Sequence, residues 1–332
     1  MDVRPVSRLC PHQRGLQNLS RSPAIHLPMS KREARPAKPD AAKDELGKFL
    51  LRAEALMKRI EVWVSADAEV PDFAGYTAFR WRRRNARGHF QPVTQLHQIR
   101  LQDLQGIDRQ KALVERNTLQ FVQGLMANNV LLTGARGTGK SSLVKALLNQ
   151  YTGAGLRLIE VEKHDLMDLP DIIEPLAGQR FRFILFCDDL SFGADEPGYT
   201  SLKAVLDGSV SATPDNVLIY ATSNRRHLMP EYMRENLETK YLGDEIHPGE
   251  SVEEKISLSE RFGLWVSFYP FDQDEYLSIV RYWLSQHGVG PPDAEAARQE
   301  AIQWALQRGS RSGRVASQFA RDWAGRRRLD PR

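Results

Sequence analysis

A glycine-rich segment at residues 134–141 holds the side chains of this chain best suited to chemistry. It fits the pattern G-x-x-x-x-G-K-[ST] at every position. In this pattern the glycines let the backbone curl so that its N–H groups cradle phosphate oxygens, while the lysine reaches the outer phosphates and the hydroxyl binds Mg²⁺. A glycine-rich turn without a ligand is the alternative. We predict a nucleoside triphosphate site formed by Gly134, Ala135, Arg136, Gly137, Thr138, Gly139, Lys140, Ser141 and Ser142.

Acidic and amide side chains follow two apolar runs further along the chain. Asp188 and Asp189 come after one run, and Asn224 comes after the next. We expect Asp188 to hold Mg²⁺ together with Ser141, and Asp189 to orient or activate the attacking water. Asn224 is placed to hydrogen-bond that water or the γ-phosphate. The alternative for both acids is that they only cap the next turn, as aspartate often does.

These side chains need a scaffold that brings distant strand ends together. Apolar runs predict buried strands at 130–133, 156–161, 181–187, 216–222 and 266–269. One helical pattern, at 101–122, precedes these strands, and others lie between them, at 142–148, 166–176 and 201–206. Strands that are apolar throughout and alternate with helices predict an α/β fold with a parallel sheet covered on both faces. Ligands of such sheets bind at the carboxyl ends of the strands, where the phosphate loop, the two acids and Asn224 are predicted to meet.

Two arginines beyond this region are candidates for phosphate contacts. Arg261 lies beside apolar residues that would hold it in a defined direction, which suits an arginine finger reaching a neighbour's γ-phosphate; a surface salt bridge is the alternative. Arg314 lies at a predicted helix start, within helices at 273–286 and 294–323 that we expect to form an all-helical lid. A turn with Gly106 and Ile107, before the first strand, is suited to lie against the adenine of a nucleotide.

The ends of the chain differ from its middle in charge and pattern. Residues 1–40 hold eight basic and three acidic residues without periodicity, which predicts disorder, and Met29 is a plausible alternative start. Residues 308–332 hold eight arginines against two aspartates, so the body between the two ends is acidic. An apolar stripe over 44–64 predicts an amphipathic helix that packs on the main domain or on a partner. We expect residues 65–92 to be irregular.

Aromatic residues inside the 65–92 segment accompany a cluster of arginines. This combination is able to stack on and pair with nucleic acid, or it belongs to a linker folded onto the core. The basic ends of the chain likewise have two interpretations: they contact nucleic acid, or they are solvated and weakly structured. The clustered arginines are Arg80, Arg82, Arg83, Arg84 and Arg87.

Composition narrows the class of protein further. The 332 residues are 41% hydrophobic and 27% charged, and no stretch approaches the ~20 apolar residues of a membrane span. The two cysteines, Cys10 and Cys187, argue against a disulfide framework and have no metal-ligand spacing. We therefore expect a cytoplasmic protein that does not enter a membrane.

Taken together, these motifs resemble those of AAA+ ATPases, and across about residues 95–320 the chain closely resembles a bacterial AAA+ family catalogued as a domain of unknown function. The resemblance rests on GARGTGKSSLVKALL (134–148), FILFCDDLSF (183–192), LKAVLDGS (202–209), IYATSNRRHLMPE (219–231), EEKISLSERFGLW (253–265) and GSRSGRVASQF (309–319). It implies ATP and Mg²⁺ as ligands. By the same resemblance Asp188 and Asp189 are the Walker B acids, Asn224 is sensor 1 and Arg261 is the arginine finger. Arg314 is then the sensor 2 arginine, and Gly106 with Ile107 forms the adenine-side segment. The second Walker B acid is usually glutamate, so the shorter Asp189 suggests slow hydrolysis.

Three functions fit the sequence to different degrees. The leading one is an ATP-hydrolysing AAA+ protein that assembles as a ring or arc, since an arginine finger acts on a neighbouring subunit. It would remodel or load an unidentified macromolecular client, with nucleic acid as one candidate. A nucleotide-gated adaptor with little hydrolysis is the second, and a small-molecule kinase is the third. We expect a tail at 1–40, a helical region and linker at 41–95, a nucleotide-binding domain at 96–271, a lid at 272–325 and a basic tail at 326–332.

Overall fold

The structure, a computed structural model, describes residues 39–64, 71–84, 87–192, 197–208, 213–225, 240–242, 245–247 and 258–329. The chain divides into two compact units, Met1–Asp67 and Ala68–Arg332. Within the first unit, helix α1 spans Pro39–Val64 and so begins five residues before the predicted 44–64. Proline suits the first turn of a helix, where its missing N–H is not needed. Most of the predicted disordered tail, residues 1–38, lies outside the described residues.

The second unit is built on a seven-stranded sheet in the order β2-β1-β4-β5-β6-β3-β9. All neighbouring strands run parallel except β1 and β2, which pair antiparallel. The five strands predicted from apolar runs have bounds within two residues of those runs. In spatial order these strands are β4 (Leu156–Glu160), β5 (Arg182–Cys187), β6 (Val217–Ser223), β3 (Val130–Gly134) and β9 (Leu264–Phe268).

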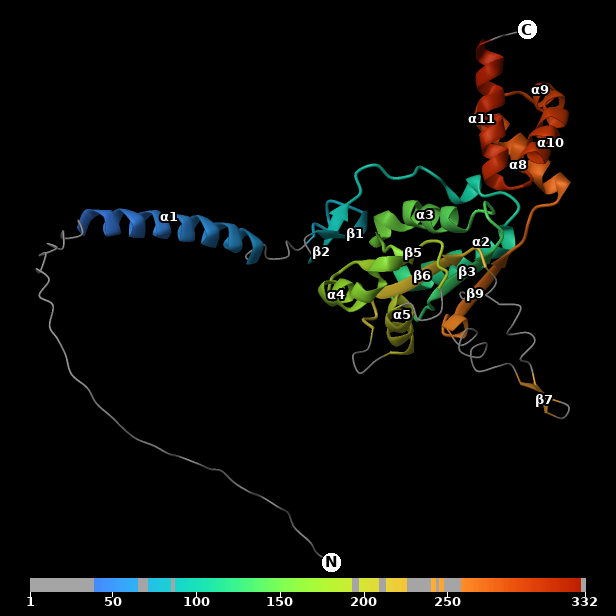
Figure 1. The fold of residues 1–332 in the computed structure, drawn as a ribbon. Coiled ribbons are helices and arrows are strands. Elements are labelled where there is room, and N and C mark those ends of the chain that lie inside the picture. The colour runs from blue at the N-terminus through green and yellow to red at the C-terminus, as the bar shows by residue number, and fades with distance from the viewer. Residues whose placement is uncertain are drawn as a thin grey trace, which may run out of the picture. The chain divides into compact units, whose positions relative to one another are not determined.

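Helices cover both faces of this sheet, as Figure 1 shows. Side chains of β3 alternate between two buried clusters: Leu132 packs with α2 (Asp108–Val122) and α3 (Lys140–Tyr151), and Leu131 packs with the opposite layer. That layer comprises α4 (Leu169–Ile173) between the 3-10 turns Lys163–Asp168 and Glu174–Leu176, and α5 (Pro197–Asp207). The three-layer α/β architecture predicted from the apolar strands is therefore confirmed.

The 65–92 segment departs from the irregular structure expected of it. Residues 71–84 and 87–92 are described, and they contain strands β1 (Ala78–Arg84) and β2 (Arg87–Pro92), a hairpin added to the edge of the sheet. Phe79 and Trp81 alternate with arginines, so that the aromatic rings are buried and the arginines face outward. Burial of rings of this size stabilises a fold by about 1.5–3 kcal/mol each, which favours the strand over an irregular path.

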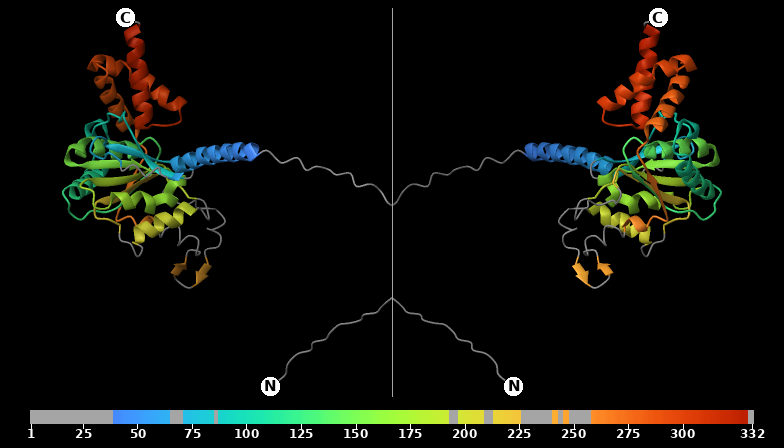
Figure 2. Two further views of the ribbon diagram at one scale, coloured as in Figure 1. Left: turned by 90° about the vertical axis from the view of Figure 1, so that its left-hand side faces the viewer. Right: turned by 90° about the vertical axis from the view of Figure 1, so that its right-hand side faces the viewer.

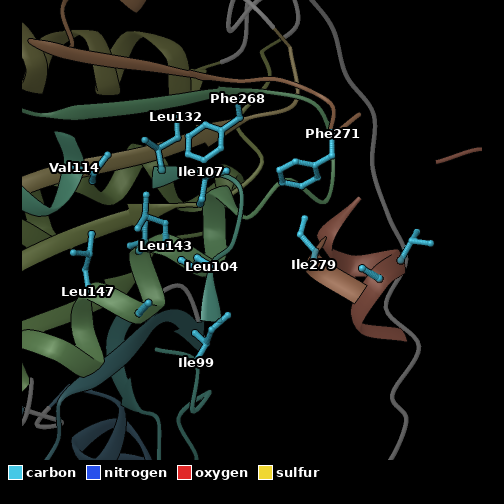
Figure 3. Close-up of a cluster of buried hydrophobic side chains, with 14 of the residues drawn as sticks. Ile99, Leu104, Ile107, Val114, Leu132, Leu143, Leu147, Phe268, Phe271 and Ile279 are labelled. Carbon is cyan, nitrogen blue, oxygen red and sulfur yellow. The ribbon is translucent and has the colours of Figure 1, made fainter. Parts of the chain in front are cut away.

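Four helices follow β9 and form the predicted helical region at the C-terminal end (Figures 1 and 2). They are α8 (Gln273–Gln286), α9 (Pro291–Ala296), α10 (Arg298–Gln307) and α11 (Gly313–Leu329). Asp272 caps α8 by accepting a hydrogen bond from the Glu275 N–H, and the Glu275 carboxylate accepts from the Asp272 N–H. One buried cluster runs from the sheet into these helices, through Phe268, Phe271 and Ile279 (Figure 3).

Smaller elements complete the described chain. A 3-10 turn at Leu101–Asp103 precedes the predicted adenine-side residues, and another at Thr152–Ala154 follows α3. Strands β7 (Lys240–Leu242) and β8 (Glu245–His247) pair with each other in a separate two-stranded sheet. No helix among the described residues is long and apolar enough to span a membrane.

Candidate functional site

The glycine-rich loop joins β3 to α3 at the carboxyl edge of the sheet. Gly134, Gly137 and Gly139 have φ values of 122°, 74° and 103°, a region that side chains with a Cβ rarely adopt. Gly134 also has no room for a side chain, because an added Cβ would lie 1.9 Å from the carbonyl oxygen of Phe268 on the neighbouring strand β9. The loop therefore adopts the curled backbone that the sequence pattern predicts.

Lys140 is the buried cation of this loop, with 5% of its surface exposed. Its Nζ donates hydrogen bonds to the carbonyl oxygens of Gly134 and Ala135, both at 2.7 Å, and to Asn224 Oδ1 at 3.1 Å. Burial lowers the pKa of Lys140 from 10.5 to about 8, although the charges of Asp188 and Asp189 oppose this shift. An anion bound beside this buried ammonium group would stabilise its charged form.

Asp188, directly after β5, accepts hydrogen bonds from two hydroxyl groups. Ser141 Oγ, on the first turn of α3, donates to Asp188 Oδ1 at 2.6 Å, and Thr222 Oγ1 of β6 donates to the same oxygen at 2.6 Å. Thr222 was not among the predicted site residues, and its only signal in the sequence is its position two residues before Asn224. Among the described residues, no group of three His, Cys, Asp or Glu side chains is able to hold a metal by itself, so a cation here would need further oxygen ligands.

Asp189 is held in an unusual backbone conformation beside Asp188. Its φ of 52° makes it the one non-glycine residue with positive φ in the part of the chain that the structure describes. Its N–H donates to Thr222 Oγ1 at 2.9 Å, and its carboxylate accepts a hydrogen bond from Asn224 Nδ2. Aspartate tolerates the left-handed region better than most residues, and strained positions of this kind cluster at functional sites.

These contacts join three strand ends into one continuous network. It runs from Ser141 through Asp188, Thr222, Asp189 and Asn224 to Lys140, all by hydrogen bonds between neighbours. Every member except Thr222 was predicted from the sequence to lie at this edge of the sheet.

Ile107, one of the two residues predicted to lie beside the adenine, and Arg314 also lie against the loop. A Cβ added at Gly139 would lie 3.4 Å from Ile107 Cδ1, and Ile107 is buried. The Arg314 N–H donates to the Gly137 carbonyl oxygen at 3.4 Å, and the charge of Arg314 contributes to the lowered pKa of Lys140. Arg261, by contrast, lies just before β9 and forms an ion pair with Asp207 at the end of α5.

A cavity of about 540 Å³ adjoins the loop on the side of the helical region. It is lined by loop residues, by residues just after β9, and by the end of α10 with its connection to α11. Its lining residues are Ala135, Arg136, Thr138, Pro270, Phe271, Ala305, Leu306, Gly309, Ser310 and Arg311. Its volume lies in the range of small-molecule sites, roughly 300–1,000 Å³.

The arginines of the β1–β2 hairpin have intramolecular partners. Arg80 Nε donates to Glu160 Oε2 at 2.7 Å, and Arg82 pairs with Glu162. Arg83 pairs with Asp168, a carboxylate that also accepts a hydrogen bond from Trp81 Nε1 at 2.9 Å. These contacts attach the hairpin to β4 and to the 3-10 turn after it. Ion pairs within the fold therefore explain three of the clustered arginines without a nucleic-acid ligand.

The largely parallel sheet, the phosphate loop between β3 and α3 and the helical region after β9 define a P-loop NTPase fold of the AAA+ type. The chain belongs to the family described as "Protein of unknown function (DUF815)", whose family model matches residues 74–327. No curated protein matches the chain.

Several solved structures are similar to the chain at low identity. A mutant of RuvB from Thermotoga maritima is 16% identical with a TM-score of 0.41, over 67% of this chain and 63% of that one, so this chain spans just under two thirds of its length. A DNA replication initiation factor is 16% identical with a TM-score of 0.40, over 70% and 64%. The HORMA:CdnC:Trip13 complex of E. coli MS115-1 contains a chain that is 12% identical with a TM-score of 0.42, over 67% and 90%.

Proposed function

We propose that the protein binds ATP with Mg²⁺ at the glycine-rich loop and hydrolyses it to remodel or load a macromolecular client. The observation that carries this proposal is the continuous hydrogen-bond network from Ser141 to Lys140 through three strand ends. A network of charged and polar side chains beside a buried, desolvated lysine is costly unless an anion completes it. A triphosphate supplies that charge.

Each member of the network has a role that its position supports. Lys140 would move from the loop carbonyls to the β- and γ-phosphates, and the loop N–H groups would hold the remaining phosphate oxygens. Ser141 and Asp188 offer adjoining oxygen ligands of the kind Mg²⁺ prefers, and the metal, when bound, would neutralise charge on the phosphates. Asp189, with Asn224 beside it, would accept a proton from the attacking water and orient it.

The two arginines outside the network suggest assembly with neighbouring subunits. Arg314 contacts the loop from the helical region and would stabilise charge on the phosphates of its own subunit. Arg261 is paired with Asp207, and as an arginine finger it would exchange this partner for the nucleotide of the next subunit. A finger that acts on a neighbour requires a homo-oligomer, which we propose to be a ring or an arc.

Steady-state ATP turnover across a protein concentration series tests this function. Specific activity should rise with concentration, because Arg261 completes a neighbour's site. Alanine variants of Lys140, Asp189 and Arg261 should lose activity, whereas control variants of the same residue types outside the site should keep it. The controls are Lys145→Ala on α3, Asp171→Ala on α4 and Arg281→Ala on α8. Concentration-independent turnover that survives Arg261→Ala would exclude the finger in trans.

A second candidate is a nucleotide-gated adaptor with little intrinsic hydrolysis, with nucleic acid as one candidate client. The observation that favours it is Asp189, whose short carboxylate is hydrogen-bonded by Asn224 Nδ2 and would reach the water less well than glutamate. Nucleotide binding without turnover by concentrated wild type, with and without added DNA, would select this candidate. Turnover comparable to that of an Asp189→Glu variant would reject it.

A further inference from the structure

Helix α1 (Pro39–Val64), one uninterrupted helix in Figure 1, carries large apolar side chains that are exposed. Each has between 57% and 68% of its surface exposed: Leu46, Phe49, Leu50, Leu51, Leu56 and Met57. The described residues of the first unit, 39–64, are this helix alone, so that part of the unit offers no second element against which these side chains pack. Because helices in proteins owe most of their stability to packing of an apolar face, we expect α1 to bury this surface against a partner.

The apolar residues of α1 recur every seven residues. If heptad positions are lettered a to g from Leu46, positions a, d and e are apolar in three successive heptads. Position a holds Leu46, Ala53 and Ile60, position d holds Phe49, Leu56 and Trp63, and position e holds Leu50, Met57 and Val64. A seven-residue repeat favours helices that supercoil around one another, because on a straight helix the same positions drift by about 20° per heptad. Apolar residues at e as well as at a and d give the wider face typical of a helical bundle.

The charges of α1 lie off this face and balance one another. The helix has five acidic and five basic residues, so its net charge is zero. Lys48 Nζ lies 3.1 Å from Asp44 Oδ2, and Lys58 Nζ lies 3.1 Å from Glu54 Oε1. These four residues occupy positions b, c and f, so two copies of the helix would meet without net repulsion and without a charge at a, d or e. A helix that lies on an anionic membrane instead has an excess of lysine and arginine on its polar face.

We propose that α1 is a self-association element, whose a, d and e face packs against the same face of α1 in a second copy of the chain. The seven-residue repeat, the exposed leucines and the balanced charge all suit this occupant. The contact requires neither nucleotide nor Arg261, so it goes beyond the proposed function and does not depend on it. It would hold copies of the chain together through α1, separately from any interface that the α/β domains form.

Analytical ultracentrifugation of the full chain across a concentration series, without nucleotide or Mg²⁺, tests this assignment. Wild type should associate reversibly. Leu56→Glu places a charge at position d and should raise the dissociation constant by at least about tenfold, because a buried leucine is lost from each copy. Leu51→Glu is the matched control, since Leu51 is a similarly exposed leucine of the same helix but lies at position f, and it should leave association unchanged. Arg261→Ala should also leave it unchanged, which separates this contact from an arginine-finger interface.

Three other outcomes would overturn the inference. Wild type that stays monomeric at its highest soluble concentration would exclude a second copy, and a lowered free energy of unfolding in Leu56→Glu would then assign the face to packing on the α/β domain. Equal effects of Leu56→Glu and Leu51→Glu, including no effect of either, would place the association elsewhere. Monomeric wild type that floats with phosphatidylserine vesicles would assign the face to a membrane surface. None of these results bears on the proposed nucleotide site, because the measurement is made without nucleotide.

Discussion

The lowered pKa of Lys140 makes nucleotide affinity depend on pH in a defined direction. In the free protein, burial places this pKa at about 8. An adjacent phosphate favours the charged ammonium and raises the pKa in the complex, so binding takes up a proton. A lysine with a pKa of about 8 is roughly nine-tenths protonated at pH 7 and roughly one-tenth protonated at pH 9. Affinity for ATP should therefore fall about tenfold between these two pH values.

Calorimetric titration in two buffers of different ionisation enthalpy measures the proton uptake directly. Uptake attributable to Lys140 should rise from about 0.1 proton per site at pH 7 to about 0.5 at pH 8 and about 0.9 at pH 9. Burial raises the pKa of Cys187 and of Tyr220 to about 12, so neither group titrates in this window. Lys140→Arg is the control, because arginine stays charged throughout, and any residual binding should vary less with pH.

Two results would refute this reasoning. Wild-type affinity that stays constant from pH 7 to pH 9 would mean that Lys140 is not the desolvated cation that receives the phosphates. A Lys140→Arg variant that binds ATP with the same pH slope as wild type would assign the titration to another group.

Three further predictions concern the metal, the loop and the hairpin. Ser141→Ala should abolish most of the gain in ATP affinity on adding Mg²⁺, and a gain equal to that of wild type would exclude Ser141 as a ligand. Gly134→Ala should lower the free energy of unfolding by about 3 kcal/mol or more in urea titrations, since its Cβ would overlap the Phe268 carbonyl; a wild-type midpoint would contradict the close approach of β3 and β9. Trp81→Phe removes the hydrogen bond to buried Asp168 and should cost about 1–3 kcal/mol in the same assay, whereas no loss would show that this bond does not stabilise the hairpin.

The central strands and the members of the network were predictable because their signals are local. An apolar run ending in a polar residue marks both a buried parallel strand and the edge where ligands bind. Helix α8 has the predicted bounds, 273–286, because its apolar spacing is regular. The short helix predicted over 166–176, around Pro170, is instead α4 with a 3-10 turn on each side. Pro170 and Pro175, which lack N–H donors, lie within this stretch.

The hairpin β1–β2 was missed because its partners are distant in sequence. Arg80, Arg82 and Arg83 resemble a solvated or nucleic-acid-binding cluster until Glu160, Glu162 and Asp168 are brought beside them. The alternation of Phe79 and Trp81 with arginines was the available signal for a strand buried on one face.

Residues whose importance depends on a tertiary contact were missed for the same reason. Thr222 and Phe271 lie within ordinary apolar segments, and only the fold shows that one contacts both acids and the other lines the cavity. The ion pair between Arg261 and Asp207 likewise joins residues that no sequence spacing connects.

A crystal structure of the protein with Mg²⁺ and a non-hydrolysable ATP analogue tests the central claim most directly. We predict the triphosphate within the glycine-rich loop, Lys140 Nζ moved from the loop carbonyls to the phosphates, and the metal bound by Ser141 and Asp188. Asn224 and Asp189 should face the γ-phosphate. An analogue bound away from the loop, or one bound with Lys140 still hydrogen-bonded to Gly134 and Ala135, would contradict a nucleotide site formed by these three strand ends.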